Sequence, residues 1–141
     1  MLVFPSREWC EEVVRLVNAD PESVEAGQGW VGDFGVVVER EAGKLERSFT
    51  IHCVPRDGKI HNLRLLEDPD ELEEIEPRYL ARAPYSVWKA LIQQTLDPIE
   101  ALVRRRISVD GDVQQLIERM RYKGIAERVL AKLNTGFVDE R

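Results

Sequence analysis

The sequence predicts an α+β fold with a five-stranded, mostly antiparallel sheet covered on one face by helices. Apolar and polar residues alternate with a period of two in five segments, at 32–40, 47–54, 60–66, 79–83 and 106–110. Apolar stripes at helical spacing occupy the segments around them. A chain of 141 residues buries about two thirds of its unfolded surface. We therefore expect a single domain over 1–141.

The N-terminal part predicts an amphipathic helix that begins after Ser6. Trp9, Val13 and Val17 recur at helical spacing, and acidic and basic residues occupy the other side. The helix is expected to end near Asn18. Residues 20–29, which contain a proline and two glycines, are interpreted as a connection.

The first two strands are predicted to be half buried. Their core-facing residues alternate with polar ones and are Phe34, Val36, Val38, Phe49, Ile51 and Cys53. A turn at Asp57-Gly58 leads into the third strand. A two-residue loop there would place Arg64 opposite Ile51, in the core. A three-residue loop with a bulge keeps Arg64 outside, so we favour its pairs: Phe49 with Leu65, Ile51 with Leu63 and Cys53 with His61.

The segment 67–77 is strongly acidic and is interpreted as a solvated connection. Leu72 and Ile75 could fix one helical turn to the body. A cation site is the alternative, but the segment lacks the glycine and alternating oxygen ligands of an EF-hand loop. A strand over 79–83 and a helix that opens at Pro84 follow.

The segment 96–113 contains the clearest local signals of the chain. Asp97 is predicted to be a helix N-cap, Pro98 the first helical residue, and Glu100 the partner in a capping box. A short strand ends at Gly111, and Asp112 can cap the next helix.

The C-terminal part predicts two further apolar helical faces. The helix after Asp112 carries Val113, Leu116, Ile117 and Met120. The final helix carries Ile125, Val129, Leu130 and Leu133 and is expected to stop near Asn134 and Gly136, a plausible C-cap.

The central stretch resembles the C-terminal pattern of sterol carrier protein type 2 (SCP-2) domains. The residues that carry the resemblance are Trp88, Leu96-Asp97-Pro98, Ala101-Leu102, Ile107-Ser108-Val109 and Gly111-Asp112. The sequence departs from the family at Gln94-Thr95, where Gly-Lys is usual, and at Arg104-Arg105, where a small pair is common. The resemblance covers most of the chain and is that of a prokaryotic, stand-alone member. It implies a sheet and a helical layer that enclose a tunnel for a sterol-like lipid, a fatty acid or an acyl-CoA.

The resemblance also implies that apolar residues of the sheet and helices line this tunnel. By composition alone the same residues would form an ordinary core. The ligand-binding candidates are Phe34, Val36, Val38, Phe49, Ile51, Leu63, Leu65, Trp88, Leu91, Leu102, Leu116, Met120, Ile125 and Val129. The implied function is a lipid carrier or reservoir, and the alternative is an interaction or dimerisation module on the same scaffold. Either a monomer or a homodimer fits.

Composition narrows the classes of partner and location. The chain has 20 basic and 26 acidic residues, and the resulting net charge of −6 disfavours nucleic acid. No apolar run approaches the roughly 20 residues of a transmembrane helix, and no signal-peptide pattern is present. The C-terminal residues Val138-Asp139-Glu140-Arg141 lack a peroxisomal address. We expect a cytoplasmic protein with Cys10 and Cys53 reduced and buried.

No catalytic motif is recognisable, so we expect neither an enzyme nor a cofactor. His52 and His61 are expected on opposite sheet faces and cannot share a metal ion. His61 beside Cys53 is better interpreted as a histidine at the edge of a core than as a reactive pair. The cluster Arg104-Arg105-Arg106 is interpreted as a solvated helix end. The alternative is that one of these arginines binds the head group of an amphiphile at a pocket mouth.

Overall fold

A computed structural model describes residues 1–120 and 124–140, with Met120 described by its backbone alone. The elements in chain order are β1 (Leu2–Phe4), α1 (Arg7–Ala19), α2 (Pro21–Ala26), β2 (Phe34–Glu39), β3 (Phe49–Arg56), β4 (Lys59–Leu66), α3 (Glu71–Ile75), β5 (Tyr79–Pro84), α4 (Tyr85–Ile92), α5 (Pro98–Val103), β6 (Ser108–Asp110), α6 (Val113–Met120), α7 (Ile125–Lys132), β7 (Thr135–Phe137) and the 3-10 turn η1 (Val138–Glu140).

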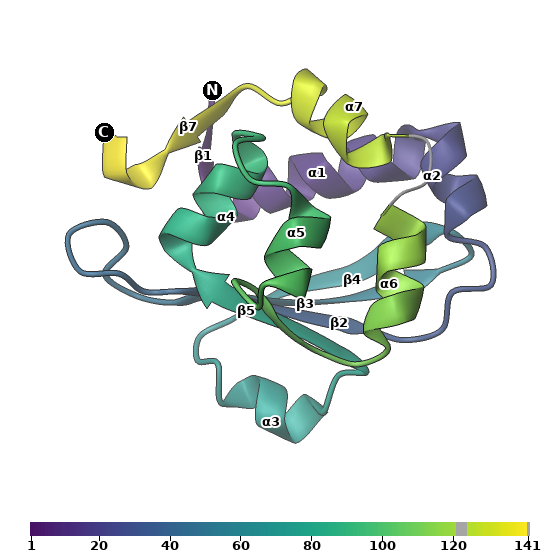
Figure 1. Cartoon of the computed structure of the whole chain (residues 1–141), viewed down its shortest axis with the longest axis horizontal. Helices are drawn as coiled ribbons and strands as arrows, with labels where there is room; N and C mark the ends of the chain where they lie inside the picture. The colour runs from purple at the N-terminus through teal and green to yellow at the C-terminus, as the bar shows by residue number, and fades with distance from the viewer. Residues whose placement is uncertain (121–123, 141) are drawn as a thin grey trace.

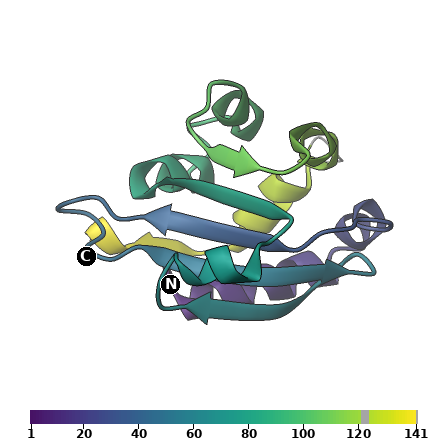
Figure 2. The same cartoon turned by 90° about the horizontal axis from the view of Figure 1, so that it is seen from below.

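The main sheet has five strands in the order β4-β3-β2-β5-β6, seen from below in Figure 2. The pairs β2–β3, β3–β4 and β5–β6 are antiparallel, whereas β2 and β5 run parallel. The predicted α+β class with a mostly antiparallel five-stranded sheet is therefore confirmed. Most helices lie above this sheet in Figure 1.

The opposite face of the sheet is covered by α3, which lies below it in Figure 1. Leu72 of α3 is buried against Val37 of β2 and Leu66 of β4, and Ile75 packs on the same cluster. The acidic segment was predicted to be a solvated connection, and its acidic side chains are mostly exposed. The helical turn of α3 is nevertheless fixed to the body, because Leu72 and Ile75 pack on apolar residues of the outer sheet face.

The predicted register of β3 and β4 is wrong. The turn has two residues, Asp57 and Gly58, with φ values of 54° and 78°, which is a type I′ geometry with Arg56 paired to Lys59. Beyond it a bulge at Asn62, whose φ is 53°, inserts one residue into β4. The bulge shifts the far part of the hairpin so that the partners are Thr50 with Leu66, Ile51 with Leu65 and His52 with Arg64. The bulge therefore keeps Arg64 on the outer face of the sheet, which the prediction had attributed to a three-residue loop.

The predicted connection after Asn18 contains a helix, α2. The Asp20 carboxylate accepts hydrogen bonds from the backbone N–H groups of Glu22 and Ser23, at 3.0 and 3.2 Å, and so caps it. Arg128 of α7 donates to both oxygens of Asp20, at 3.0 and 3.1 Å. This side-chain hydrogen bond lowers the pKa of Asp20 below its usual value. Asp20 thus joins α7 to the start of α2.

The two ends of the chain form a parallel two-stranded ladder of β1 and β7, visible side by side in Figure 1. The partners are Leu2 with Thr135, Val3 with Gly136 and Phe4 with Phe137. The final helix ends one residue earlier than expected, with Leu133 as its C-cap. Gly136, predicted to take part in the cap, instead lies in β7.

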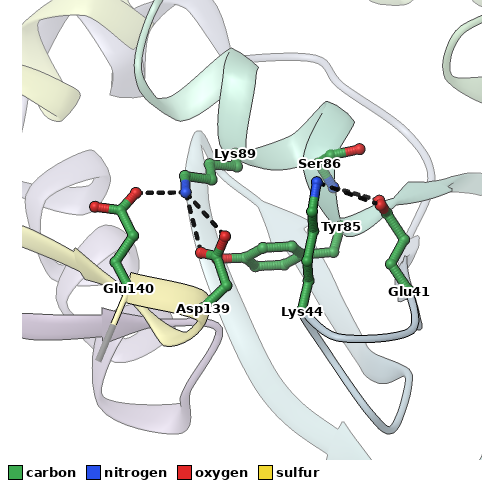
Figure 3. Close-up of polar contacts among 7 residues, drawn as sticks. All are labelled: Glu41, Lys44, Tyr85, Ser86, Lys89, Asp139 and Glu140. Atoms are coloured by element: carbon green, nitrogen blue, oxygen red, sulfur yellow. Dashed lines mark hydrogen bonds and ion pairs between the residues drawn. The ribbon is translucent and has the colours of Figure 1, made fainter.

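A polar cluster holds the C-terminal turn against α4 (Figure 3). The hydroxyl of Tyr85, which is fully buried, donates to Asp139 Oδ1 at 2.7 Å. Lys89 Nζ donates to both oxygens of Asp139, at 3.0 and 3.1 Å, and also pairs with Glu140. At the N-terminus of the same helix, the Ser86 N–H donates to Glu41 at 2.6 Å. The contacts of Asp139 and Glu140 fix the C-terminal turn to α4, and the Glu41 contact fixes the loop after β2 to the same helix.

Replacing Thr50 by valine is expected to raise the free energy of unfolding by about 1 kcal/mol. Thr50 is 1% exposed and lies between Val37 and Leu66 on the outer sheet face, and its hydroxyl has no partner among the described residues. Valine has nearly the same shape and no hydroxyl to desolvate. Thr95→Val is the matched control, because the exposed Thr95 hydroxyl does bind, to the Ala90 carbonyl at 3.2 Å. Urea titrations of both variants test this, and a less stable Thr50→Val would contradict it.

Candidate functional site

Two adjoining cavities lie between the helical layer and the inner face of the sheet. The larger, of about 680 Å³, is called the wide chamber, and the smaller, of about 250 Å³, the narrow chamber. The wide chamber falls within the roughly 300–1,000 Å³ that is common for small-molecule sites. Four residues line both chambers: Trp9, Pro98, Ala126 and Leu130. They lie between the two chambers, which are therefore direct neighbours.

The wide chamber is lined by residues from most parts of the fold. Its walls include Val13 and Val17 of α1, Phe34 of β2 and Leu116 of α6. The helix α2 and the Asp57-Gly58 turn close one side, where Gly27 and Gly58 pack backbone to backbone. The remaining lining residues are Ser23, Ala26, Trp30, Cys53, Pro55, Lys59, Ile60, Asp97, Ile99, Arg119, Gly124, Ile125, Glu127 and Val129.

The narrow chamber is apolar throughout its described lining. Besides the four shared residues, that lining consists of Phe4, Cys10, Val36, Val38, Phe49, Ile51, Trp88, Leu91 and Ile92. The rings at its far end are packed closely, since the Phe4 ring centroid lies 4.9 Å from that of Trp9 and 5.9 Å from that of Tyr85. The Trp88 indole N–H donates to the carbonyls of Val37 and Ala83, both at 3.1 Å, which fixes the ring in the chamber wall.

The long axis of the site follows the strands. Along β2, Phe34 lines the wide chamber and Val36 and Val38 line the narrow one. The order is the same along β3 in the reverse direction, because the strands are antiparallel and Val36 pairs with Ile51. The two chambers therefore lie one after the other along the strands, the wide one toward the Asp57-Gly58 turn and the narrow one toward the Val38–Phe49 pair.

Ten of the predicted ligand-binding residues line one of the chambers. In the wide chamber these are Phe34, Leu116, Ile125 and Val129, and in the narrow chamber Val36, Val38, Phe49, Ile51, Trp88 and Leu91. The Met120 side chain lies outside the described residues.

Three predicted residues line neither chamber in the described part of the chain. Leu63 and Leu65 belong to β4, the edge strand of the sheet: Leu63 lies at the bulge and has no partner in the ladder, and Leu65 pairs with Ile51 but lies outside both chambers. Leu102 packs instead with Ala101 and Ile107 in the core cluster beneath α5.

The sequence prediction missed the contribution of α1 and of the loop before β2. Trp9, Val13 and Val17 form the apolar face of the first helix, which was expected to pack on the sheet but borders the site. Trp30 stacks on Phe34 with 5.4 Å between ring centroids and packs at a tilt against Tyr79 with 4.8 Å. All three tryptophans of the chain therefore line the site, and their fluorescence is an intrinsic reporter of its contents.

The charged lining residues belong to the wide chamber: Lys59, Asp97, Arg119 and Glu127. The guanidinium of Arg119 lies 5.8 Å from the Trp30 ring centroid and donates to the carbonyls of Ala26 and Gln28. Among the described residues, the cluster Arg104-Arg105-Arg106 is exposed and lines neither chamber. The Arg104 side chain pairs with Glu100 at 3.1 Å. The interpretation of the cluster as a solvated helix end fits this exposed position.

The polar groups near the site form no recognisable catalytic constellation in the described part of the chain. Cys10 and Cys53 are free thiols, and desolvation by burial raises the pKa of Cys10 to about 12 and that of Cys53 to about 11. Both are therefore poor nucleophiles at neutral pH. His52 Nε2 lies 2.7 Å from Asp33 Oδ2, on the sheet face opposite the chambers. No group of three acidic, histidine or cysteine side chains among residues 1–120 and 124–140 could hold a metal ion.

No described helix is long and apolar enough to cross a bilayer. The sequence matches no protein-family model and no curated protein.

Comparison with solved structures shows an SCP-2-like fold. A conserved hypothetical protein of Thermus thermophilus, described as a possible sterol carrier protein, superposes with a TM-score of 0.74 at 16% identity, over 93% of this chain and 90% of that one. A crystal structure of sterol carrier protein 2 gives 0.69 at 18% identity, over 89% and 93%. The sterol carrier protein domain 2 of Helicoverpa armigera gives 0.54 at 13%, over 91% and 89%. At these identities the likeness concerns the fold.

Proposed function

We propose that this chain, with its SCP-2-like fold, binds an amphiphile with an apolar tail and acts as a lipid carrier or reservoir. The observation that carries the proposal is the pair of neighbouring chambers, whose lining is mainly apolar while the charged lining residues gather in the wide chamber. Such a division suits a molecule with one apolar and one polar end. Fatty acids, acyl-CoA esters and sterol-like lipids are the candidate ligands.

The proposed role is binding and needs no catalytic step. It also suits a reducing compartment such as the cytoplasm, because free thiols at Cys10 and Cys53 persist where disulfides are disfavoured. The competing function is an interaction or dimerisation module with an unoccupied, collapsible site.

Addition of a fatty acid is expected to raise the melting temperature. A ligand that binds the folded state alone stabilises it by about 2.7 kcal/mol when its free concentration is a hundredfold above Kd. Native mass spectrometry of protein purified from cells should also show a retained amphiphile. No shift with any fatty acid, acyl-CoA or sterol below its micellar concentration, together with a constant dimer mass, would favour the interaction module.

Alkylation of Cys53 supplies a site-specific version of the same test. Cys53 is half-buried and lines the wide chamber, so a bound ligand should slow its reaction with N-ethylmaleimide. A Cys10→Ser variant isolates the Cys53 signal. Unchanged alkylation at saturating ligand would place the ligand outside the wide chamber.

A further inference from the structure

The two chambers differ in volume and in the charge of their lining residues. The wide chamber holds all of the charged lining residues described, and the narrow chamber holds none. A polar head group left in the narrow chamber would lose its hydration without a described charged partner. An amphiphile is therefore oriented with its head in the wide chamber and its tail pointing toward Val38 and Phe49.

Packed aromatic rings border the narrow chamber beside Val38 and Phe49. Phe4 lines it, and behind Phe4 stand Phe137 of β7, with ring centroids 6.4 Å apart, and the fully buried Tyr85. Trp9, which lines both chambers and packs edge-on against Phe4, is held by a hydrogen bond from its indole N–H to the Thr135 hydroxyl at 3.0 Å. Close-packed walls of this kind do not yield to one more methylene without strain.

We propose that the narrow chamber measures the tail, so that the protein selects single-chain amphiphiles by chain length, with Val36 as a length-determining residue. This inference rests on the proposed function. From Pro55 in the wide chamber to Phe49 in the narrow chamber, β3 advances six residues, which is about 20 Å at roughly 3.3 Å per residue. An extended alkyl chain advances about 1.25 Å per carbon, given a C–C bond of about 1.5 Å and near-tetrahedral angles. The site therefore accommodates about 16 carbons.

Val36 stands where the tail enters the narrow chamber. It faces the chamber from β2 and pairs with Ile51 of β3. A larger side chain there would shorten the available path to the part between Pro55 and Ile51, about 13 Å or ten carbons. Because Val36 points into empty space, the substitution does not need to displace packed neighbours.

The test is a titration of saturated fatty acids of 8 to 20 carbons, each below its micellar concentration, monitored by tryptophan fluorescence. In the wild type, Kd should fall about fourfold per added methylene up to about 16 carbons and then stop falling. In Val36→Phe the improvement should stop at about ten carbons. Val103→Phe is the matched control, since Val103 is exposed on α5 and lines neither chamber, and it should keep the wild-type limit.

Leu91 lines the same chamber from α4, so Leu91→Trp is the second variant for this test if Val36→Phe fails to fold. A wild type that binds fatty acids with no length limit up to 20 carbons would overturn the inference and leave the proposed function standing. The same holds if both chamber variants fold and keep the wild-type limit, because the tail then lies elsewhere. A wild type that binds no fatty acid would overturn the proposed function and this inference with it.

Discussion

Gly58→Ala is expected to lower the free energy of unfolding by about 3 kcal/mol or more. Gly58 has a φ of 78°, and a Cβ atom there would stand 2.0 Å from the Val24 carbonyl oxygen of α2. Left-handed backbone costs a residue with a Cβ about 1–2 kcal/mol, and overpacking against a fixed backbone adds about 1–3 kcal/mol. The change also pushes α2 away from the turn that closes the wide chamber, so ligand affinity should fall in parallel. Urea unfolding followed by tryptophan fluorescence measures the first effect.

Gly43→Ala separates conformation from contact. Gly43 has a similar φ of 80°, but a Cβ there would meet nothing within 4 Å. Its cost should therefore be limited to the backbone term of about 1–2 kcal/mol, with no change in ligand binding. Equal losses in the two variants would show that the close approach of α2 to the turn is unimportant.

The elements predicted correctly are those with local signals. The side chains of Ser6, Asp97 and Asp112 accept hydrogen bonds from the backbone N–H three residues ahead, at 3.1, 2.9 and 3.1 Å, as expected of N-caps. The five main strands likewise follow from alternation within a few residues. Asp20-Pro21 repeats the Asp97-Pro98 signal, so α2 was also accessible from the sequence, and its interpretation as a connection overlooked that cap.

The missed elements depend on distant partners. The strands β1 and β7 have three residues each, and their pairing joins the two ends of the chain, so no local pattern announces them. The bulge at Asn62 also depends on distant residues. The local sequence allows a turn of either length at Asp57-Gly58, and the observed register depends on where Arg64 and Leu66 lie relative to the neighbouring strand.

The site was predictable as a set of apolar residues but not as a space. Val36 and Leu102 are equally apolar in the sequence, yet Val36 borders the narrow chamber and Leu102 packs in the core. A cavity differs from a core by the distance between elements, which depends on packing by Trp9, Pro98 and other residues of α1, α5 and α7. That distance cannot be read from the local sequence pattern.

Lys89→Met is expected to lower the free energy of unfolding by about 2 kcal/mol. The Lys89 and Asp139 side chains are 17% and 14% exposed, and removing one partner of a largely desolvated pair leaves the other charge poorly compensated. The Lys89 ammonium also lies 5.1 Å from the Phe137 ring centroid, and methionine keeps an unbranched apolar side chain without the charge, so the loss concerns mainly the charge. Lys44→Met is the matched control and should change stability by less than about 0.5 kcal/mol, because Lys44 is 48% exposed and 3.9 Å from Glu41. Similar losses in both variants would contradict the importance of the pair.

The same pair predicts how stability depends on pH. Partial burial acts to raise the pKa of Asp139, but hydrogen bonds from Tyr85 and Lys89 outweigh it and hold the pKa below its usual value. A carboxyl whose pKa is lower in the folded state stabilises the protein fully above its unfolded pKa of about 3.9, and this contribution is lost as pH falls through the folded pKa. Asp139→Asn removes that titration, so its destabilisation should be largest at neutral pH and shrink below about pH 4. Urea unfolding of wild type and variant from pH 7 to pH 2 measures this, and a difference that is constant across the range would show that Asp139 acts through shape and not through charge.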